Sequence, residues 1–138
     1  MRYLAIYRSA QPEGTPPTVE TMTKMGNLIE EMTKARVLLS TEGCLPSALG
    51  VRVRKSGGRI TVTDGPFAES KEIVGGFALF QVSSKEEAIE WTKRFLEIAG
   101  DGESEIRQLV SADDFGPEVT PALREQDERS RDRMAARR

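Results

Sequence analysis

The residues best suited to chemistry lie in one short stretch, from Asp64 to Lys71. Asp64 and Glu69 supply carboxylates there, and Lys71 supplies an ammonium group. Phe67 adds an aromatic ring, and Gly65-Pro66 makes the backbone rigid because proline restricts its own φ and the residue before it. Opposite charges beside rigid backbone can shape a polar pocket and shift each other's pKa values. Asp64 is therefore a candidate general acid or base, and the candidate ligand-binding residues of this stretch are Phe67, Glu69 and Lys71.

The same stretch has two other interpretations. Asp-Gly-Pro is ordinary turn chemistry after a strand, because aspartate caps a turn by accepting nearby backbone N–H groups. A charged turn before the hinge at Gly75-Gly76 could instead contact a partner. The chain contains no histidine, the commonest general base at neutral pH. Asp64 alone would need its pKa raised by burial to work near pH 7, which weakens the enzymatic interpretation.

Two tyrosines near the N-terminus are further candidates for ligand binding. In a strand over residues 2–8, Tyr3 and Tyr7 share one face, and Leu4 and Ile6 share the other. A strand that is apolar on both faces is usually central in its sheet and covered on both sides. The hydroxyls of Tyr3 and Tyr7 could meet a ligand, or the rings could line the core or a dimer contact.

The elements that must position these residues follow from hydrophobic periodicity. The sequence predicts strands at 2–8, 36–42, 76–82 and 104–110, helices at 18–35 and 84–99, and a hairpin at 51–63. Without the hairpin, this order is the split β-α-β plan of ferredoxin-like domains, in which the first and third core strands are central. The predicted fold class is therefore α+β and ferredoxin-like, with an inserted β-hairpin. Because two helices cover only one face of the sheet, we expect a homodimer of the dimeric α+β barrel type.

Two faces can be predicted in more detail. The apolar stripe of the helix at 18–35 consists of Val19, Met22, Met25 or Gly26, Ile29, and Met32 or Thr33. In the hairpin, Arg52, Arg54 and Arg59 indicate a basic face. Such charges are typical of a solvated edge, and an anion or the transcription machinery is the alternative contact.

Composition argues against several classes of protein. The 20 Lys and Arg against 22 Asp and Glu leave a formal charge of −2, so direct nucleic-acid or membrane binding is not expected. No apolar run is long enough to span a bilayer. The single Cys44 allows no internal disulfide and fits a cytoplasmic location. With one cysteine and no histidine, we expect no metal site of usual composition and no cofactor.

The composition changes after Phe115. Between Leu123 and Met134 no large apolar residue occurs, so this segment can bury little surface. We therefore expect one domain at 1–115 and a polar C-terminal tail at 116–138. The tail would be partly helical or disordered, or would lie across a partner subunit.

The central stretch also resembles a known family. The matching segments are residues 61–72, 75–77, 42–46, 51–54 and 105–109. They resemble the DGPF branch of the YCII-related family, and the resemblance runs from about residue 2 to 115. It implies a dimeric ferredoxin-like domain of a small bacterial protein, often linked to extracytoplasmic-function sigma factors and mostly without an assigned activity. Enzymes of the wider family are thought to use an Asp–His pair, which this chain cannot form.

Two functions therefore remain open. The first is a small-molecule-binding or regulatory module, whose partners would be a second copy, an unidentified small molecule, and a sigma factor or the transcription machinery. The alternative is a small-molecule enzyme that uses Asp64 as general acid or base in a cavity at the sheet face. In that case the turn at Asp64 should lie at the rim of the cavity, with Lys71 stabilising an anion.

Overall fold

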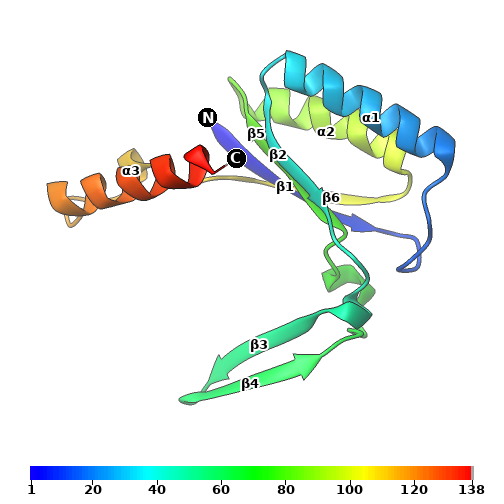
Figure 1. Ribbon diagram of the computed structural model, residues 1–138, viewed down its shortest axis with the longest axis horizontal. Helices are drawn as coiled ribbons and strands as arrows, with labels where there is room; N and C mark the ends of the chain where they lie inside the picture. Colours follow the sequence, from blue (N-terminus) through cyan, green and yellow to red (C-terminus); the bar gives the residue numbers. More distant parts are fainter. Residues whose placement is uncertain (138) are drawn as a thin grey trace.

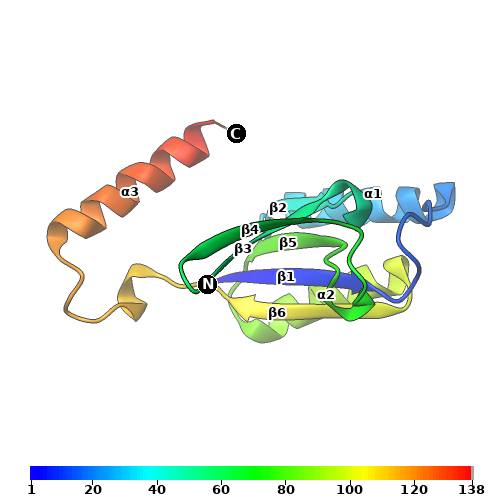
Figure 2. The ribbon, with the colours of Figure 1, turned by 90° about the horizontal axis from the view of Figure 1, so that it is seen from below.

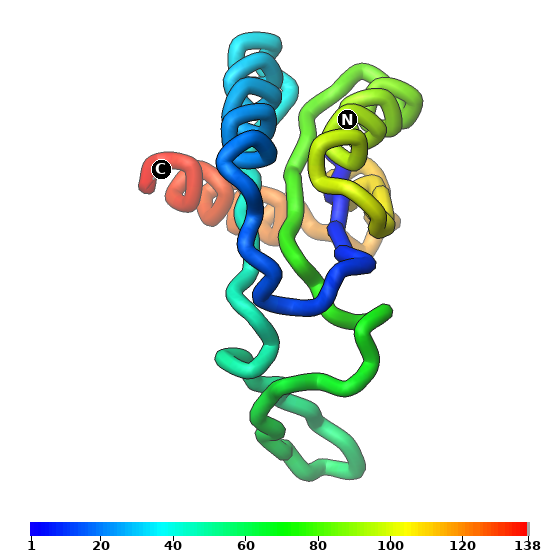
Figure 3. Tube along the Cα trace, turned by 90° about the vertical axis from the view of Figure 1, so that its right-hand side faces the viewer, coloured from blue at the N-terminus to red at the C-terminus, as the bar shows by residue number. Residues whose placement is uncertain are grey.

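The computed structural model describes residues 1–137, and its largest element is a four-stranded antiparallel sheet in the order β2-β5-β1-β6 (Figure 1). The strands of this sheet are β1 (Arg2–Ser9), β2 (Leu38–Gly43), β5 (Gly76–Gln81) and β6 (Gly102–Gln108). Two helices, α1 (Val19–Lys34) and α2 (Lys85–Ala99), lie side by side on one face of it (Figure 3). The central strands are β1 and β5, as predicted, and the α+β, ferredoxin-like fold class is confirmed. Among the described residues, no helix could cross a membrane.

The inserted hairpin forms a sheet of its own. Strands β3 (Val51–Ser56) and β4 (Arg59–Asp64) pair only with each other, in antiparallel register. Figures 1 and 2 show the hairpin standing out from the body on the side of the sheet that the helices leave uncovered. The hairpin is joined to the body by two short 3₁₀ turns, η1 (Ser47–Leu49) and η2 (Ser70–Glu72). In the linker after β4, the Gly65-Pro66 peptide bond is cis.

The helix ends are determined locally. Thr18 caps α1, because its Oγ1 accepts a hydrogen bond from the backbone N–H of Thr21 at 3.1 Å. Ser84 caps α2 in the same way. Gly100 ends α2 with a φ of 92°, a backbone conformation that favours glycine, as expected from its position after the last apolar residue.

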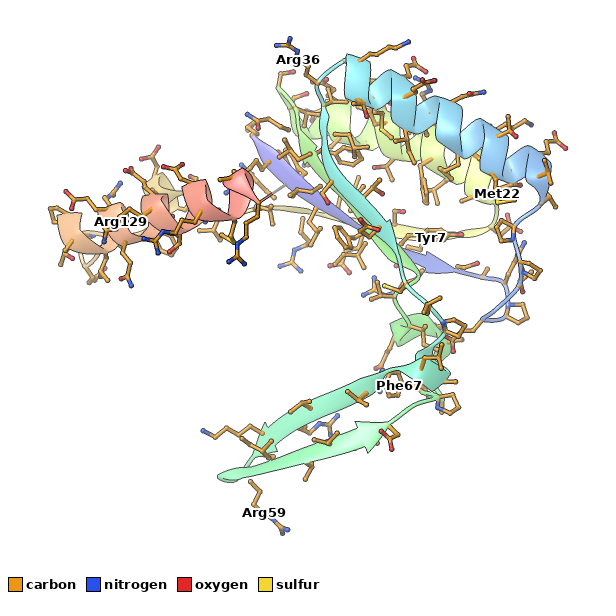
Figure 4. All side chains as sticks on the ribbon, in the orientation of Figure 1. Tyr7, Met22, Arg36, Arg59, Phe67 and Arg129 are labelled. Carbon is orange, nitrogen blue, oxygen red and sulfur yellow. The ribbon has the colours of Figure 1, made fainter. Side chains whose placement is uncertain are left out.

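The core lies between the sheet and the two helices. Its buried apolar residues are Tyr3, Ala5, Leu28, Met32, Val37, Phe80, Val82 and Ala88. The predicted stripe of α1 is wrong in its first half, since Val19 and Met22 are 76% and 52% exposed, and it omits Leu28, which is buried together with Met32. The first turns of α1 extend beyond the strands, so no sheet lies beneath Met22 (Figure 4).

The C-terminal segment carries a turn, η3 (Ala112–Asp114), and a helix, α3 (Pro121–Ala136). Helix α3 has no buried residue and stands apart from the body (Figures 1 and 2). Two ion pairs at i,i+4 spacing run along it, Glu125–Arg129 at 3.9 Å and Asp127–Arg131 at 2.8 Å. Such exposed pairs contribute little free energy of unfolding, so α3 is, within the described residues, a polar helix that buries no side chain.

A candidate ligand cavity beneath the helices

The strand register places a row of small residues at one end of the helix-covered face. Gly43 of β2 pairs with Gly76 of β5, Gly76 pairs with Tyr7 of β1, and Tyr7 pairs with Ser104 of β6. Tyr7 lies two residues from the buried Ala5, so this row faces the helices. Because two of its four positions have no side chain, the row places little side-chain volume between the sheet and the helices.

Above this row the helices leave a cavity of about 310 Å³. From α1, the cavity is lined by Met25, Ile29 and Met32, and from α2 by Thr92 and Phe95. The next row of the sheet, which includes Ala5 and Ala78, is also small and continues the floor. The cavity therefore arises from short side chains on the strands beneath long ones on the helices.

The two glycines of the row have different steric requirements. A Cβ at Gly76 would lie 2.7 Å from the backbone oxygen of Glu42, so strand packing itself requires glycine there. A Cβ at Gly43 would meet only the backbone oxygen of Gly75, at 3.9 Å. A Cβ at position 43 is therefore sterically allowed, and Gly43 is an exposed residue that lines the cavity.

Four hydroxyl groups belong to residues that line the cavity. Thr41 Oγ1 donates to the backbone oxygen of Phe77 at 2.9 Å. Thr92 Oγ1 donates to the backbone oxygen of its own helix one turn earlier, at 2.8 Å. The hydroxyls of Tyr7 and Ser104 have no hydrogen-bond partner within residues 1–137. The hydrogen-bonding capacity left for a ligand is thus at the β6 side of the cavity, where the Tyr7 hydroxyl lies next to Gly102.

Of the residues that the sequence suggested for a site, only Tyr7 lines this cavity. Its ring stands edge-on to Phe95, with the ring centroids 5.0 Å apart. Tyr3 is 4% exposed and belongs to the core, where it pairs with Phe80. The four candidates from the Asp64 stretch lie at the base of the hairpin, and Asp64 itself is exposed at the end of β4.

Backbone and side-chain contacts of that stretch connect the hairpin to the neighbouring loops. The backbone N–H of Phe67 donates to Ser47 Oγ at 3.2 Å, and the ring of Phe67 lies 3.9 Å from the guanidinium of Arg52. Arg52 also pairs with Glu72, at 3.6 Å. Within the described residues, Asp64 and Lys71 form no ion pair. A Cβ at Gly65 would overlap the backbone oxygen of Ser47, so the linker packs tightly against η1.

Contacts among Glu13, Ser47 and Phe67 hold the hairpin to the body and are called the hairpin joint below. Glu13 and Ser47 were not among the site residues predicted from the sequence. The carboxylate of Glu13 accepts hydrogen bonds from the backbone N–H of Ser47 at 2.7 Å and from its hydroxyl at 2.6 Å. Both bonds favour the ionised form and hold the pKa of Glu13 below its usual range. The partners lie 34 residues apart, so no local pattern could have indicated this contact.

The side chains that face the cavity from the strands and helices include no carboxylate. Glu42 is the one lining residue with a carboxylate, and it pairs with Phe77 in the register that faces away from the helices. Elsewhere in the described residues, no cluster of three or more metal-ligating side chains occurs, and Cys44 is exposed. The arrangement can therefore hold a small molecule in a partly open pocket, with the hydroxyl-bearing residues Tyr7 and Ser104 at one side.

Comparison with known proteins identifies a family and solved structures to which this chain is similar. The model of the YCII-related domain matches residues 1–112. No curated protein matches the chain. A solved structure that is similar to it is 5-chloro-2-hydroxyhydroquinone dehydrochlorinase from Burkholderia phenoliruptrix AC1100, in complex with 2,5-dihydroxybenzoquinone. That match has 13% identity and a TM-score of 0.42, and it covers 82% of this chain and 97% of that chain.

Proposed function

This chain belongs to the YCII-related domain family, and we propose that it is a small-molecule-binding protein whose ligand lies in the cavity beneath α1 and α2. The cavity of about 310 Å³ carries the proposal, because it reaches the range of about 300–1,000 Å³ that is typical of ligand pockets. Protein interiors otherwise contain few voids larger than a water molecule. A hollow of this size beneath two packed helices is therefore a candidate site for a bound small molecule.

The residue at position 43 supports this proposal. Filling a hollow with apolar side chains stabilises a fold, and a Cβ at Gly43 would make no clash. Glycine nevertheless occupies this position, where it leaves the cavity open. Gly76 cannot be used in this argument, because strand packing alone requires its glycine.

A thermal-shift screen against a metabolite library tests the proposal. We expect at least one compound that raises the melting temperature of the wild type but not that of Gly43→Leu, in which the new side chain fills the cavity. The matched control is Gly26→Leu, which adds the same side chain to an exposed position of α1 with nothing within 4 Å. A screen without hits, or with hits that Gly43→Leu retains, contradicts a site in this cavity.

A second part of the proposal is that the protein works as a homodimer. The helices leave one face of the sheet uncovered, and its central residues are Leu4, Ile6, Phe77 and Leu79. In the hairpin, Val51, Val53, Ile60 and Val62 share one face and are all exposed. Isolated two-stranded hairpins are marginal in water, and apolar faces of this kind mark interfaces. A second copy brings the same two surfaces, so each copy can cover the other.

Light scattering at micromolar concentration measures the oligomeric state. We expect a dimer for the wild type and a monomer for Ile6→Glu, because a charge without a partner would be buried in the interface. The control is Val19→Glu, which places the same charge at an exposed position of α1. A monomeric wild type contradicts this part of the proposal and leaves the cavity untouched.

Two finer functions follow from the sequence. Regulation of a sigma factor rests on the family resemblance, and the exposed hairpin would be its contact surface. Catalysis by Asp64 has less support, because Asp64 lies outside the cavity and Lys71 does not pair with it. Substitution of Asp64 by Asn is expected to leave ligand binding in the cavity unchanged.

A further inference from the structure

The charges around the cavity indicate what kind of molecule it holds. The side chains that face it come from Ala, Gly, Ile, Met, Phe, Ser, Thr and Tyr, none of which is charged at neutral pH. The carboxylate of Glu42 belongs to the opposite face of the sheet. An ionised ligand would therefore lose its hydration without gaining an opposite charge, which is strongly unfavourable.

The hydroxyls add one polar end to this apolar surface. Thr41 and Thr92 already donate to backbone oxygens. Tyr7 and Ser104 are paired across β1 and β6, and their hydroxyls are free to donate to a ligand oxygen or accept from a ligand hydroxyl. A ligand with one hydrogen-bonding group at one end can therefore bond to these hydroxyls while the rest of it contacts the apolar lining.

The size of the cavity limits the size of the ligand. An apolar cavity of about 150 Å³ admits benzene, so about 310 Å³ admits a molecule of about a dozen non-hydrogen atoms. Met25 and Met32 on the α1 side are flexible and polarisable, so they can adapt to ligands of somewhat different shape. The polarity and the size of a ligand should therefore decide whether it binds more than its exact shape does.

We infer that the ligand of this protein is an uncharged, mostly apolar molecule of about a dozen non-hydrogen atoms with a single hydroxyl or carbonyl group directed to Tyr7 and Ser104. This inference rests on the proposed function, since it names the chemical class that the same cavity takes. It excludes phosphorylated, carboxylated and amine metabolites. It also implies that the ligand binds in its neutral form at every pH.

Three related probes separate polarity from shape: naphthalene, naphthol and naphthoate, titrated calorimetrically at pH 7. We expect naphthol to bind at least about tenfold more tightly than naphthoate, because the carboxylate would be buried without a partner. The double variant Tyr7→Phe/Ser104→Ala should weaken naphthol about fivefold and leave naphthalene unchanged, since it removes only the hydroxyls. The phenylalanine at position 7 keeps the ring contact with Phe95.

The pair of glycine variants links the probes to the cavity. Gly43→Leu should abolish naphthol binding, and Gly26→Leu should retain it. Naphthoate that binds as tightly as naphthol and is lost in Gly43→Leu overturns the inferred class but leaves a ligand site in the cavity. Naphthol that does not bind the wild type also overturns the inferred class. The proposed function fails separately, when the metabolite library yields no compound that is sensitive to Gly43→Leu.

Discussion

The helix-covered face of the sheet has two ends that differ in one property, the size of the strand side chains. At the packed end, the row of Leu38, Phe80 and Tyr3 fills the space under the helices, and Phe80, which also borders the cavity, is only 2% exposed. At the hollow end, the row of Gly43 and Gly76 leaves the cavity. The same four strands and two helices form both ends. A single architecture thus provides stability at one end and space at the other, according to side-chain volume alone.

The largest effect is expected at the packed end. Phe80→Ala should lower the free energy of unfolding by about 3–5 kcal/mol, because it removes an almost fully buried ring and leaves additional empty volume. Urea denaturation followed by circular dichroism measures this change. The control is Phe115→Ala, since Phe115 is exposed and its loss should fall within about 0.5 kcal/mol. Equal losses for the two variants would remove the distinction between core and surface phenylalanines.

The same truncation at the hollow end should cost less. Both phenylalanines line the cavity, but Phe95 is only partly buried whereas Phe80 is 2% exposed, so Phe95→Ala should lower the free energy of unfolding by about 1–2 kcal/mol. The same urea titration gives the value. A loss as large as that of Phe80→Ala would mean that the hollow end is as tightly packed as the other end.

Filling the cavity should act in the opposite direction. Gly43→Leu should raise the free energy of unfolding by about 0.5–1 kcal/mol, because it restricts the unfolded chain and adds apolar contacts without a clash. Differential scanning calorimetry in the absence of ligand detects the shift. A clear destabilisation would show that position 43 cannot accept a side chain, and that its glycine reflects strand packing instead of function.

The smallest effect on stability is expected at the Glu13–Ser47 contact, which lies outside both the packed end and the hollow end of the helix-covered face. The pKa of Glu13 is lowered in the folded state by its bonds to Ser47. Its contribution to stability is therefore present above the ordinary glutamate pKa of about 4.3 and is lost as the pH falls through the lowered value. The difference in melting temperature between the wild type and Glu13→Gln should be largest at neutral pH and vanish in acid. A difference that grows on acidification contradicts the assigned pKa direction.

Several features could be predicted because they depend on neighbours in the sequence. Alternation within residues 2–8 indicated a central strand, and Thr18, Ser84 and Gly100 indicated where the helices begin and end. The order of these elements was enough to predict the ferredoxin-like sheet, and the stretch around Asp64 was enough to indicate the family. The involvement of Tyr7 in ligand binding stays a prediction, although Tyr7 does line the cavity.

The cavity itself was decided only by the tertiary structure. Gly43 and Gly76 are 33 residues apart, and the sequence indicated a strand end at the first and a hinge at the second. They form one row only when β2 pairs with β5, and the row becomes a hollow only when α1 and α2 lie above it. The Glu13–Ser47–Phe67 joint likewise brings together three loops that are distant in the chain. Periodicity reports the conformation of adjacent residues, whereas empty volume depends on side chains from strands and helices that meet only after folding.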